Sequence, residues 1–352
     1  MLDIKFIREN LEIVRQNCQN KNDATDLDQL MTLDAKRRTL IQEVEDLKAR
    51  RNAVSQDIAV KKKSGADASS QIEEMRDVGD RIKVLDDDLR PTEELIDDIM
   101  MRIPNMAHES VPIGKSAEEN VEVRREGTCL DRGARKDHID VARELGILDF
   151  ERGAKVTGTG FGFYVGKGAR LERALINFFL DSNTNQRGYT EMFPPFVVNA
   201  ASLRGTGQLP KNHDDMYYIE RDELYLIPTA EVPITNYHRD EMLDINTLPV
   251  KYAGYSSCFR RESGSYGKDT RGFLRVHEFN KVELVKFVRP ETSYDELEAL
   301  VNDVELLLRA LGFTYRVLLL STGDMTFGGS KTYDLEVWSP FEQKWLEVSS
   351  CT

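Results

Sequence analysis

The sequence of 352 residues has few cysteines and histidines and no long apolar run. Its cysteines lie far apart and form no Cys-x-x-Cys pair, so we expect neither a disulfide framework nor a zinc ribbon; they are Cys18, Cys129, Cys258 and Cys351. The five histidines lack metal-ligand spacings such as His-x-x-x-His. No run could cross a bilayer, and the N-terminus is not a secretory signal. We therefore expect a cytoplasmic protein that uses neither zinc nor a membrane.

The net charge of −13 argues at first against a polyanionic partner, because the field of the whole molecule would repel phosphates. The charge is unevenly distributed, however. Residues 31–63 contain nine Lys or Arg and five Asp or Glu, whereas residues 69–101 contain four and eleven. The two stretches can attract each other, which leaves part of the basic one to face an anion.

Hydrophobic residues recur every seven positions in two N-terminal stretches, a spacing typical of coiled coils. The first series is Leu33, Leu40, Leu47 and Val54, with Val44 and Ile58 beside it. The second is Met75, Ile82, Leu89, Ile96 and Ile103, with Val78, Leu85 and Ile99 beside it. A turn at residues 63–69 separates them. We predict an antiparallel helical hairpin over residues 28–103, with legs about 50 Å long.

Two further features belong to this N-terminal domain of residues 1–103. The first seventeen residues predict one helix, with Asp3 as its N-cap and Ile4, Ile7, Leu11 and Val14 on one face. Pro91 lies inside the second leg, where we expect it to kink the helix or interrupt its hydrogen bonding.

After residue 103 the heptads stop, and the proline-punctuated residues 104–120 are the predicted linker. In residues 121–352, short strand-like runs alternate with helical ones. We predict strands at 161–165, 224–227, 282–288, 313–320 and 333–338, and helices at 169–180 and 293–311. Long helices beside hairpin-linked strands indicate an α+β domain with a mainly antiparallel sheet.

The segment from Phe259 to Glu283 is the most informative in the chain. It has the order Phe-Arg-x-Glu, then a polar loop containing Gly-Lys-Asp-Thr-Arg-Gly, then Arg-x-x-x-Phe-x-x-x-Glu. We expect two strands with cationic groups on both, aimed by a rigid sheet at phosphate oxygens, which guanidinium groups bind as a fork. The alternative is an ordinary exposed charged hairpin, which would leave Glu262 and Glu283 unexplained.

Two shorter segments have both a structural and a functional interpretation. Thr229-Ala230-Glu231 follows a strand-like run, where Thr229 could be a helix N-cap or, with Glu231, could hold an ammonium group. The alternation in residues 345–352 predicts a strand, which could be an ordinary core strand; two of its side chains, Glu347 and Ser350, offer hard oxygen atoms.

Together these segments resemble the class II aminoacyl-tRNA synthetases, and the bacterial-type seryl-tRNA synthetases in particular. The hairpin is similar to motif 2, the Thr-x-Glu segment to the serine-binding loop, and residues 187–197 to motif 1, which builds a dimer interface. Residues 205–210 and 323–328 match further loops of the family, although both could be plain turns. The resemblance implies a homodimer that joins L-serine to tRNA-Ser with ATP and Mg²⁺; charging of tRNA-Sec stays open.

The resemblance also assigns roles to residues. Serine would be held by Thr229, Ala230, Glu231, Arg260 and Glu283. ATP would be held by Arg260, Arg261, Glu262, Arg275, Val276, Phe279, Glu347, Val348, Ser349 and Ser350, and Mg²⁺ by Glu347 and Ser350. Catalysis would rest on Arg260, Glu283 and Glu347, which position and stabilise charge without a protein nucleophile. The hairpin would grip the long arm of the tRNA with Arg37, Arg38, Lys48, Arg50, Arg51, Lys61, Lys62 and Lys63.

Two alternatives remain beside this interpretation. The family continues past the position of Thr352 with a motif 3 that holds ATP phosphates, and no Gly-x-x-x-Arg segment follows Glu347 here. We therefore expect a shortened form whose activity is open. The chain could then be an inactive tRNA-binding scaffold, or a paralogue that activates an amino acid for a carrier other than tRNA. Such a paralogue, however, has no use for the long helical hairpin of residues 28–103.

Overall fold

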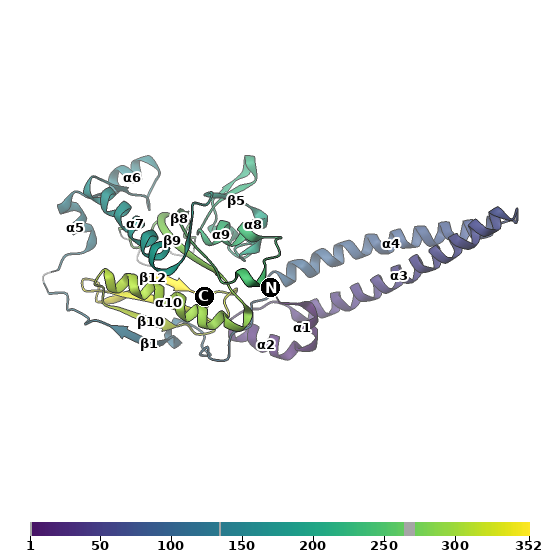
Figure 1. Cartoon of the computed structure of the whole chain (residues 1–352), viewed down its shortest axis with the longest axis horizontal. Helices are drawn as coiled ribbons and strands as arrows, with labels where there is room; N and C mark the ends of the chain where they lie inside the picture. Colours follow the sequence, from purple (N-terminus) through teal and green to yellow (C-terminus); the bar gives the residue numbers. More distant parts are fainter. Residues whose placement is uncertain (1, 134, 264–271) are drawn as a thin grey trace. The chain divides into compact units, whose positions relative to one another are not determined.

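The computed structural model describes residues 2–133, 135–263 and 272–352. The chain forms two compact units, Met1–Met106 and Ala107–Thr352, which run from purple to yellow in Figure 1. Most of the predicted Gly-Lys-Asp-Thr-Arg-Gly loop, residues 267–271, lies outside the described residues. Among the described helices, none combines the length and the apolar character needed to span a membrane.

The N-terminus forms two short helices, α1 (Ile4–Glu9) and α2 (Leu11–Asn20). The N-cap prediction is confirmed, since Asp3 accepts the N–H of Lys5 at 2.6 Å. The prediction of one continuous helix is wrong. The backbone of Asn10 leaves the helical region at φ −130°, and its side-chain amide donates to the carbonyl of Phe6 at 3.0 Å. Asparagine offers the backbone such alternative hydrogen bonds, which helix periodicity does not reveal.

The long hairpin is present as α3 (Leu27–Lys63) and α4 (Ser69–Met100), which pack side by side (Figure 1). Asp26 caps α3 by accepting the N–H of Gln29 at 2.9 Å. The helix α4 continues through Pro91 without a break, so the expected interruption does not divide it. A proline lacks an N–H donor and its ring crowds the carbonyl four residues earlier, but the helix continues on both sides, where Leu85 and Ile96 are buried.

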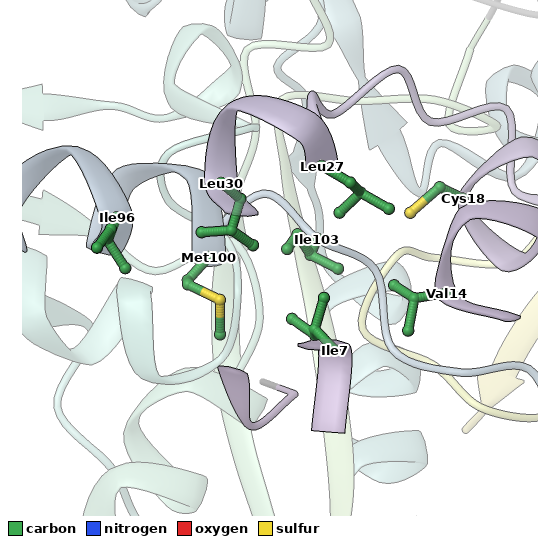
Figure 2. Close-up of a cluster of buried hydrophobic side chains, with 8 residues drawn as sticks. All are labelled: Ile7, Val14, Cys18, Leu27, Leu30, Ile96, Met100 and Ile103. Carbon is green, nitrogen blue, oxygen red and sulfur yellow. The ribbon is translucent and has the colours of Figure 1, made fainter. Parts of the chain in front are cut away.

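The predicted heptad residues form the core of the hairpin. Leu40 and Val44 of α3 are buried against Val78, Ile82 and Leu85 of α4. Nearer the N-terminal helices, a second cluster joins all four helices of this unit, and Figure 2 shows its side chains converging: Ile7, Val14, Cys18, Leu27, Leu30, Ile96, Met100 and Ile103. The hairpin is therefore anchored at one end by a small helical core.

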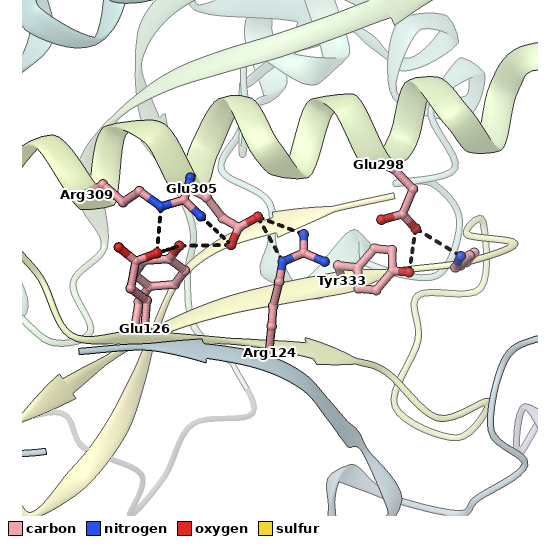
Figure 3. A network of polar contacts seen from close by, with 8 residues as sticks. Arg124, Glu126, Glu298, Glu305, Arg309 and Tyr333 are labelled. Carbon is pink, nitrogen blue, oxygen red and sulfur yellow. Dashed lines mark hydrogen bonds and ion pairs between the residues drawn. The ribbon is translucent and has the colours of Figure 1, made fainter. Parts of the chain in front are cut away.

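The second unit contains a four-stranded antiparallel sheet with the order β1 (Val121–Glu126), β10 (Tyr315–Leu319), β11 (Tyr333–Ser339) and β12 (Lys344–Cys351). The helix α10 (Ser293–Ala310) covers one face with Leu297, Val301 and Leu308. Figure 3 shows the polar part of this contact, where the carboxylate of Glu305 accepts from Arg124 of β1 at 2.7 Å. The strand and helix predictions for this part of the chain are confirmed within a few residues.

A second sheet carries the motif-2 hairpin. Its strands are β4 (Thr190–Met192), β8 (Val250–Phe259) and β9 (Glu278–Phe287); β8 and β9 are antiparallel, and β4 is parallel to β8. The long helix α7 (Lys167–Arg187) packs against it. A smaller sheet contains β5 (Val197–Asn199), β7 (Leu224–Leu226) and β6 (Tyr218–Ile219). The described strand pairs are thus mainly antiparallel, which confirms the predicted α+β class.

Short elements complete the unit. They are α5 (His138–Leu145), β2 (Leu148–Asp149), α6 (Phe150–Val156), β3 (Phe163–Tyr164), α8 (Ala200–Gly205) and α9 (Glu231–Thr235). The 3₁₀ turns are η1 (Ala117–Glu119), η2 (His213–Asp215), η3 (Glu220–Asp222), η4 (Asn236–His238), η5 (Ile245–Thr247) and η6 (Pro290–Thr292).

Most of the predicted linker, residues 104–120, belongs to the second unit. Val111 is buried against Leu318, Leu320 and Met325. The N–H of Gly114 donates to the hydroxyl of Thr322 at 3.2 Å. The prolines of this segment indicate irregular backbone, but irregular backbone can still pack, and composition alone does not separate the two cases.

Candidate active site

The ends of β7, β8 and β9 bring the predicted segments together. Phe259 closes β8 and donates its N–H to the carbonyl of Ile227, just past β7, at 2.8 Å. This bond places the Thr-x-Glu segment beside the start of motif 2. Glu283 of β9 stands opposite Gly254 of β8, within the same paired region. Segments more than fifty residues apart therefore contribute to one site.

Arg260 and Arg275 lie just outside the strands, which corrects the prediction that they sit on them. Arg260 follows the last residue of β8, and Arg275 precedes the first residue of β9 by three positions. The Nε of Arg260 donates to the carbonyl of Pro228 at 3.2 Å, and the guanidinium lies 5.1 Å from the centre of the Phe279 ring. Within the described residues, only Nε of this guanidinium is hydrogen-bonded, so both Nη groups can meet a substrate.

The Thr-x-Glu segment forms a cluster of polar contacts with β9. The buried hydroxyl of Thr229 donates to a carboxylate oxygen of Glu283 at 2.7 Å, and the N–H of Glu231 donates to the same hydroxyl at 3.2 Å. Ala230, which lies between Thr229 and Glu231 in the sequence, is fully buried. Burial raises the pKa of Glu231 to about 7, with a further contribution from the charge of Glu283. A buried carboxyl group with a raised pKa is stabilised in its charged form by a nearby cation.

Glu262 and Arg275 form an ion pair with each other. The backbone of Glu262 has φ +53°, a conformation that is uncommon for residues other than glycine. Arg261 turns away from this pair, since its Nε donates to the carbonyl of Met216 at 2.9 Å. The three predicted ATP residues thus differ in role: Glu262 and Arg275 pair with each other, whereas Arg261 anchors the turn.

Asp215 holds this turn in place, and sequence reasoning missed it. Its carboxylate accepts the N–H of Ser263 at 3.0 Å, and its carbonyl accepts the N–H of Arg261 at 2.9 Å, so both neighbours of Glu262 are fixed. A hollow of about 240 Å³ opens here; it is lined by Lys211, Asn212, Asp214, Asp215, Glu262, Ser263 and Arg275. No sequence signal marks Asp215, because the two bonds that fix this turn join it to backbone groups 46 and 48 positions away.

A bulge in β12 places Glu347 and Ser350 on one face of the sheet. Along a regular strand, residues three apart point to opposite faces. Here Glu347 pairs with Glu336, whereas Ser349 already pairs with Leu335, so Val348 is an extra residue. Ser350 then stands opposite Asp334, on the same face as Glu347. The predicted metal oxygens therefore share a face only because of the bulge.

Acidic groups gather around this face. Burial raises the pKa of Asp334 to about 7 and also raises the pKa of Glu347; Arg260 acts in the opposite direction on Glu347. One carboxylate oxygen of Asp334 is buried without a hydrogen-bond partner in the described structure. No group of three or more His, Cys, Asp or Glu suited to a metal occurs among the described residues. Any cation here would need oxygens from a ligand as well.

The cations predicted to bind tRNA lie on the hairpin of α3 and α4, the helical arm, and they fall into two groups. Three are paired: Arg38 with Asp34 at 3.2 Å, Lys48 with Asp86 at 3.9 Å, and Arg50 with Glu74. The others form no ion pair with described residues; they are Arg37, Arg51, Lys61, Lys62 and Lys63. Lys62 and Lys63 are exposed at the C-terminal end of α3, where the turn begins.

Comparison with known proteins agrees with this geometry. Residues 1–107 match the model of the seryl-tRNA synthetase N-terminal domain, and residues 217–352 match the tRNA synthetase class II core domain (G, H, P, S and T). A serine–tRNA ligase of Chlorobium phaeobacteroides (strain BS1) is 55% identical over 359 residues, which cover 100% of this chain and 84% of that protein. One from Chloroherpeton thalassium is 54% identical, with 100% and 84% covered.

A solved structure gives the same answer. The seryl-tRNA synthetase from Pyrococcus horikoshii complexed with ATP has a TM-score of 0.92 and 35% identity, covering 99% of this chain and 83% of its own. Identity above half with relatives that are matched over most of their length is sufficient to assign a family. The chain belongs to the seryl-tRNA synthetases, a family of class II aminoacyl-tRNA synthetases.

Proposed function

We propose that this chain activates L-serine with ATP to seryl-adenylate and transfers the seryl group to the 3′-terminal adenosine of tRNA-Ser. The observation that carries the assignment of residues is the meeting of Arg260, Thr229 and Glu283 at the ends of β7, β8 and β9. A guanidinium with free donors near two carboxylates, those of Glu231 and Glu283, matches the two charged ends of a zwitterionic amino acid.

The residues then divide the work of the first step. Glu231 receives the amino group of serine, Thr229 holds the carboxylate of Glu283 in place, and Glu283 accepts the serine hydroxyl. The serine carboxylate attacks the α-phosphate of ATP, pyrophosphate leaves, and Arg260 bridges carboxylate and phosphate to stabilise the developing charge. Phe279 and Glu262 hold the adenine, and Arg275 leaves its pair with Glu262 to bind the outer phosphates. Binding of ATP therefore exchanges one charged partner of Arg275 for another.

Mg²⁺ would be held through Glu347 and Ser350. Both offer hard oxygen atoms on one face of the sheet, and the unpaired oxygen of Asp334 faces the same region. Magnesium keeps several waters and takes one or two protein groups together with substrate phosphates, so this sparse set fits it. When bound, the ion would neutralise phosphate charge.

Motif 1 supports a homodimer. Phe193, which follows β4, has 79% of its surface exposed. Beside it lies a hollow of about 490 Å³, lined largely by α7 and β4. An exposed aromatic residue at the edge of a concave apolar surface is typical of a protein interface. Light scattering tests this proposal directly, because a dimer has twice the 40.2 kDa mass of the chain.

One pair of assays tests the function. Serine-dependent exchange between ATP and pyrophosphate measures activation, and charging of tRNA-Ser measures transfer. We expect both, with serine preferred to threonine and alanine because a pocket built to bind a hydroxyl leaves groups unpaired with alanine. Exchange without transfer would indicate the paralogue with another carrier, and tRNA binding without exchange would indicate the scaffold. The transfer assay repeated with tRNA-Sec tests the second acceptor.

A further inference from the structure

The hydroxyl of Thr229 has no hydrogen-bonding capacity left. A threonine hydroxyl offers one O–H and two lone pairs. The O–H donates to Glu283 at 2.7 Å, and the lone pairs accept from the N–H of Glu231 at 3.2 Å and from Nζ of Lys281 at 3.1 Å. Thr229 is therefore held from three sides, and one of its three partners is Lys281, at a position that the motif-2 pattern leaves unspecified.

Lys281 reaches the pocket from the strand that also carries Glu283. The two residues are two positions apart on β9, so their side chains leave the same face of the sheet. Nζ lies 3.3 Å from the carboxylate of Glu283, and a third of the side chain is exposed. One ammonium group thus binds both the hydroxyl and the carboxylate, and closes a triangle of short polar contacts.

The same ammonium acts on Glu231. The charged groups that face Glu231 are Glu283 and Lys281 from β9 and Arg260 from the end of β8. Burial and Glu283 raise the pKa of Glu231, whereas Lys281 and Arg260 lower it. Without Lys281, Glu231 and Glu283 would stand as two neighbouring carboxylates balanced by a single guanidinium.

We propose that Lys281 is a positioning residue of the serine pocket, which locks Thr229 onto Glu283 and leaves Glu231 as the carboxylate that receives the substrate ammonium. This inference rests on the proposed serine-binding roles of Thr229, Glu231 and Glu283. Lys281 acts through these residues and takes no part in the bond that forms between serine and the α-phosphate.

The variant K281M removes the charge and keeps most of the side-chain volume. We expect the KM for serine to rise about tenfold, the usual effect of losing one charge-assisted hydrogen bond, while the KM for ATP stays within twofold. Because Lys281 holds the pKa of Glu231 down, its loss raises that pKa, and less Glu231 is ionised at a given pH. The acid limb of kcat/KM for serine should therefore move to higher pH.

Two further variants separate positioning from folding. K281R keeps a cation and should restore the pH profile more fully than the KM. K251M makes the same chemical change in the neighbouring strand β8, opposite Lys286 and away from the pocket, and should leave both quantities unchanged. Thermal unfolding midpoints of K281M and K251M should agree within a few degrees.

Serine binding should also be titrated by calorimetry from pH 6 to 9, without ATP. If K281M binds serine as the wild type does at every pH, or if it raises the KM for ATP and serine equally, the proposal is wrong. A wild-type chain that binds serine with the expected dependence on Lys281 but shows no exchange would contradict the proposed function and support the role of Lys281. A wild-type chain that does not bind serine would contradict both.

Discussion

The helical arm, which is the hairpin of α3 and α4, and the catalytic unit are each stabilised by internal contacts, but these contacts span different distances along the sequence. In the arm, one seam repeats every seven residues, and the two legs that share it are joined by a single turn. In the catalytic unit, Thr229 bonds to Glu283 across 54 positions and Arg124 to Glu305 across 181. The arm can lose one contact and keep its neighbours, whereas the site depends on a few bonds that each join distant segments.

The largest effect should come from Arg260. R260M removes a guanidinium that acts on both Glu231 and Glu347, and we expect exchange activity to fall about 10³-fold, the effect typical of an arginine that stabilises phosphoryl transfer. Affinity for tRNA-Ser, measured by filter binding, should stay within twofold because the arm is intact. Loss of less than tenfold in exchange would contradict the assigned role. R239M, at an exposed arginine beyond α9, is the matched control.

The next effect concerns the network in Figure 3. Glu305 is buried and binds Arg124 and the hydroxyl of Tyr315. E305A leaves Arg124 without its partner, and we expect the free energy of unfolding to fall by about 3 kcal/mol. Urea unfolding followed by tryptophan fluorescence measures this unit, since Trp338 and Trp345 are the only two tryptophans and both lie in its sheet.

A matched substitution at a more exposed ion pair tests whether burial causes the loss of stability expected for E305A. Glu122 pairs with Arg125 near the edge of the same sheet, in a more exposed position. E122A should cost no more than about 1 kcal/mol, the usual value for a surface pair. Equal losses for the two variants would show that the buried network has no special role, and a change in the helical signal of the arm would show that the two units unfold together.

Much of the arm could be predicted from the sequence because its structure repeats a local rule. Leu40, Ile82 and Leu85 were expected on the seam and are buried there. The break at Asn10 was missed, since one side-chain amide that bonds to its own helix overrides the periodicity. Helix α4 continues through Pro91, which lacks the N–H donor of a regular helical residue, because the hairpin packs on both sides of it.

The site could be predicted only as separate segments. Motif spacing indicates that Thr229 and Glu283 matter, but their contact depends on how β7 and β9 meet. The bulge at Val348 shifts every later side chain of β12 by one position, and an alternating sequence contains no trace of it. Lys281 was missed for a related reason: a lysine in a strand is ordinary until its neighbours across the sheet are known.

A smaller effect is expected for the seam of the arm. Leu85 is buried between the legs, and L85A should destabilise the hairpin by about 2 kcal/mol through lost burial and a small cavity. The adjacent Val84 is half exposed, so V84A should change stability by less than about 0.5 kcal/mol. Hydrogen exchange of α3 and α4 measures both. Exchange between ATP and pyrophosphate should not change, because Leu85 lies in the first unit and the site residues lie in the second; a large loss would contradict this expectation.

The smallest effect distinguishes the two groups of arm cations. Lys48 and Arg50 already face Asp86 and Glu74, so a phosphate that binds them must compete with a carboxylate. Lys62 and Lys63 are exposed and form no ion pair with described residues. The double variant K62Q/K63Q should therefore weaken tRNA-Ser binding several-fold and reduce the salt dependence of log K by about 1 to 2 units of slope. K48Q/R50Q removes the same charge and should have less effect on both, because its cations release fewer counterions on binding. Equal weakening by the two double variants would show that the ion pairs Lys48–Asp86 and Arg50–Glu74 do not keep these cations from binding RNA. The acidic residues of α4 would then not determine which part of the arm binds RNA.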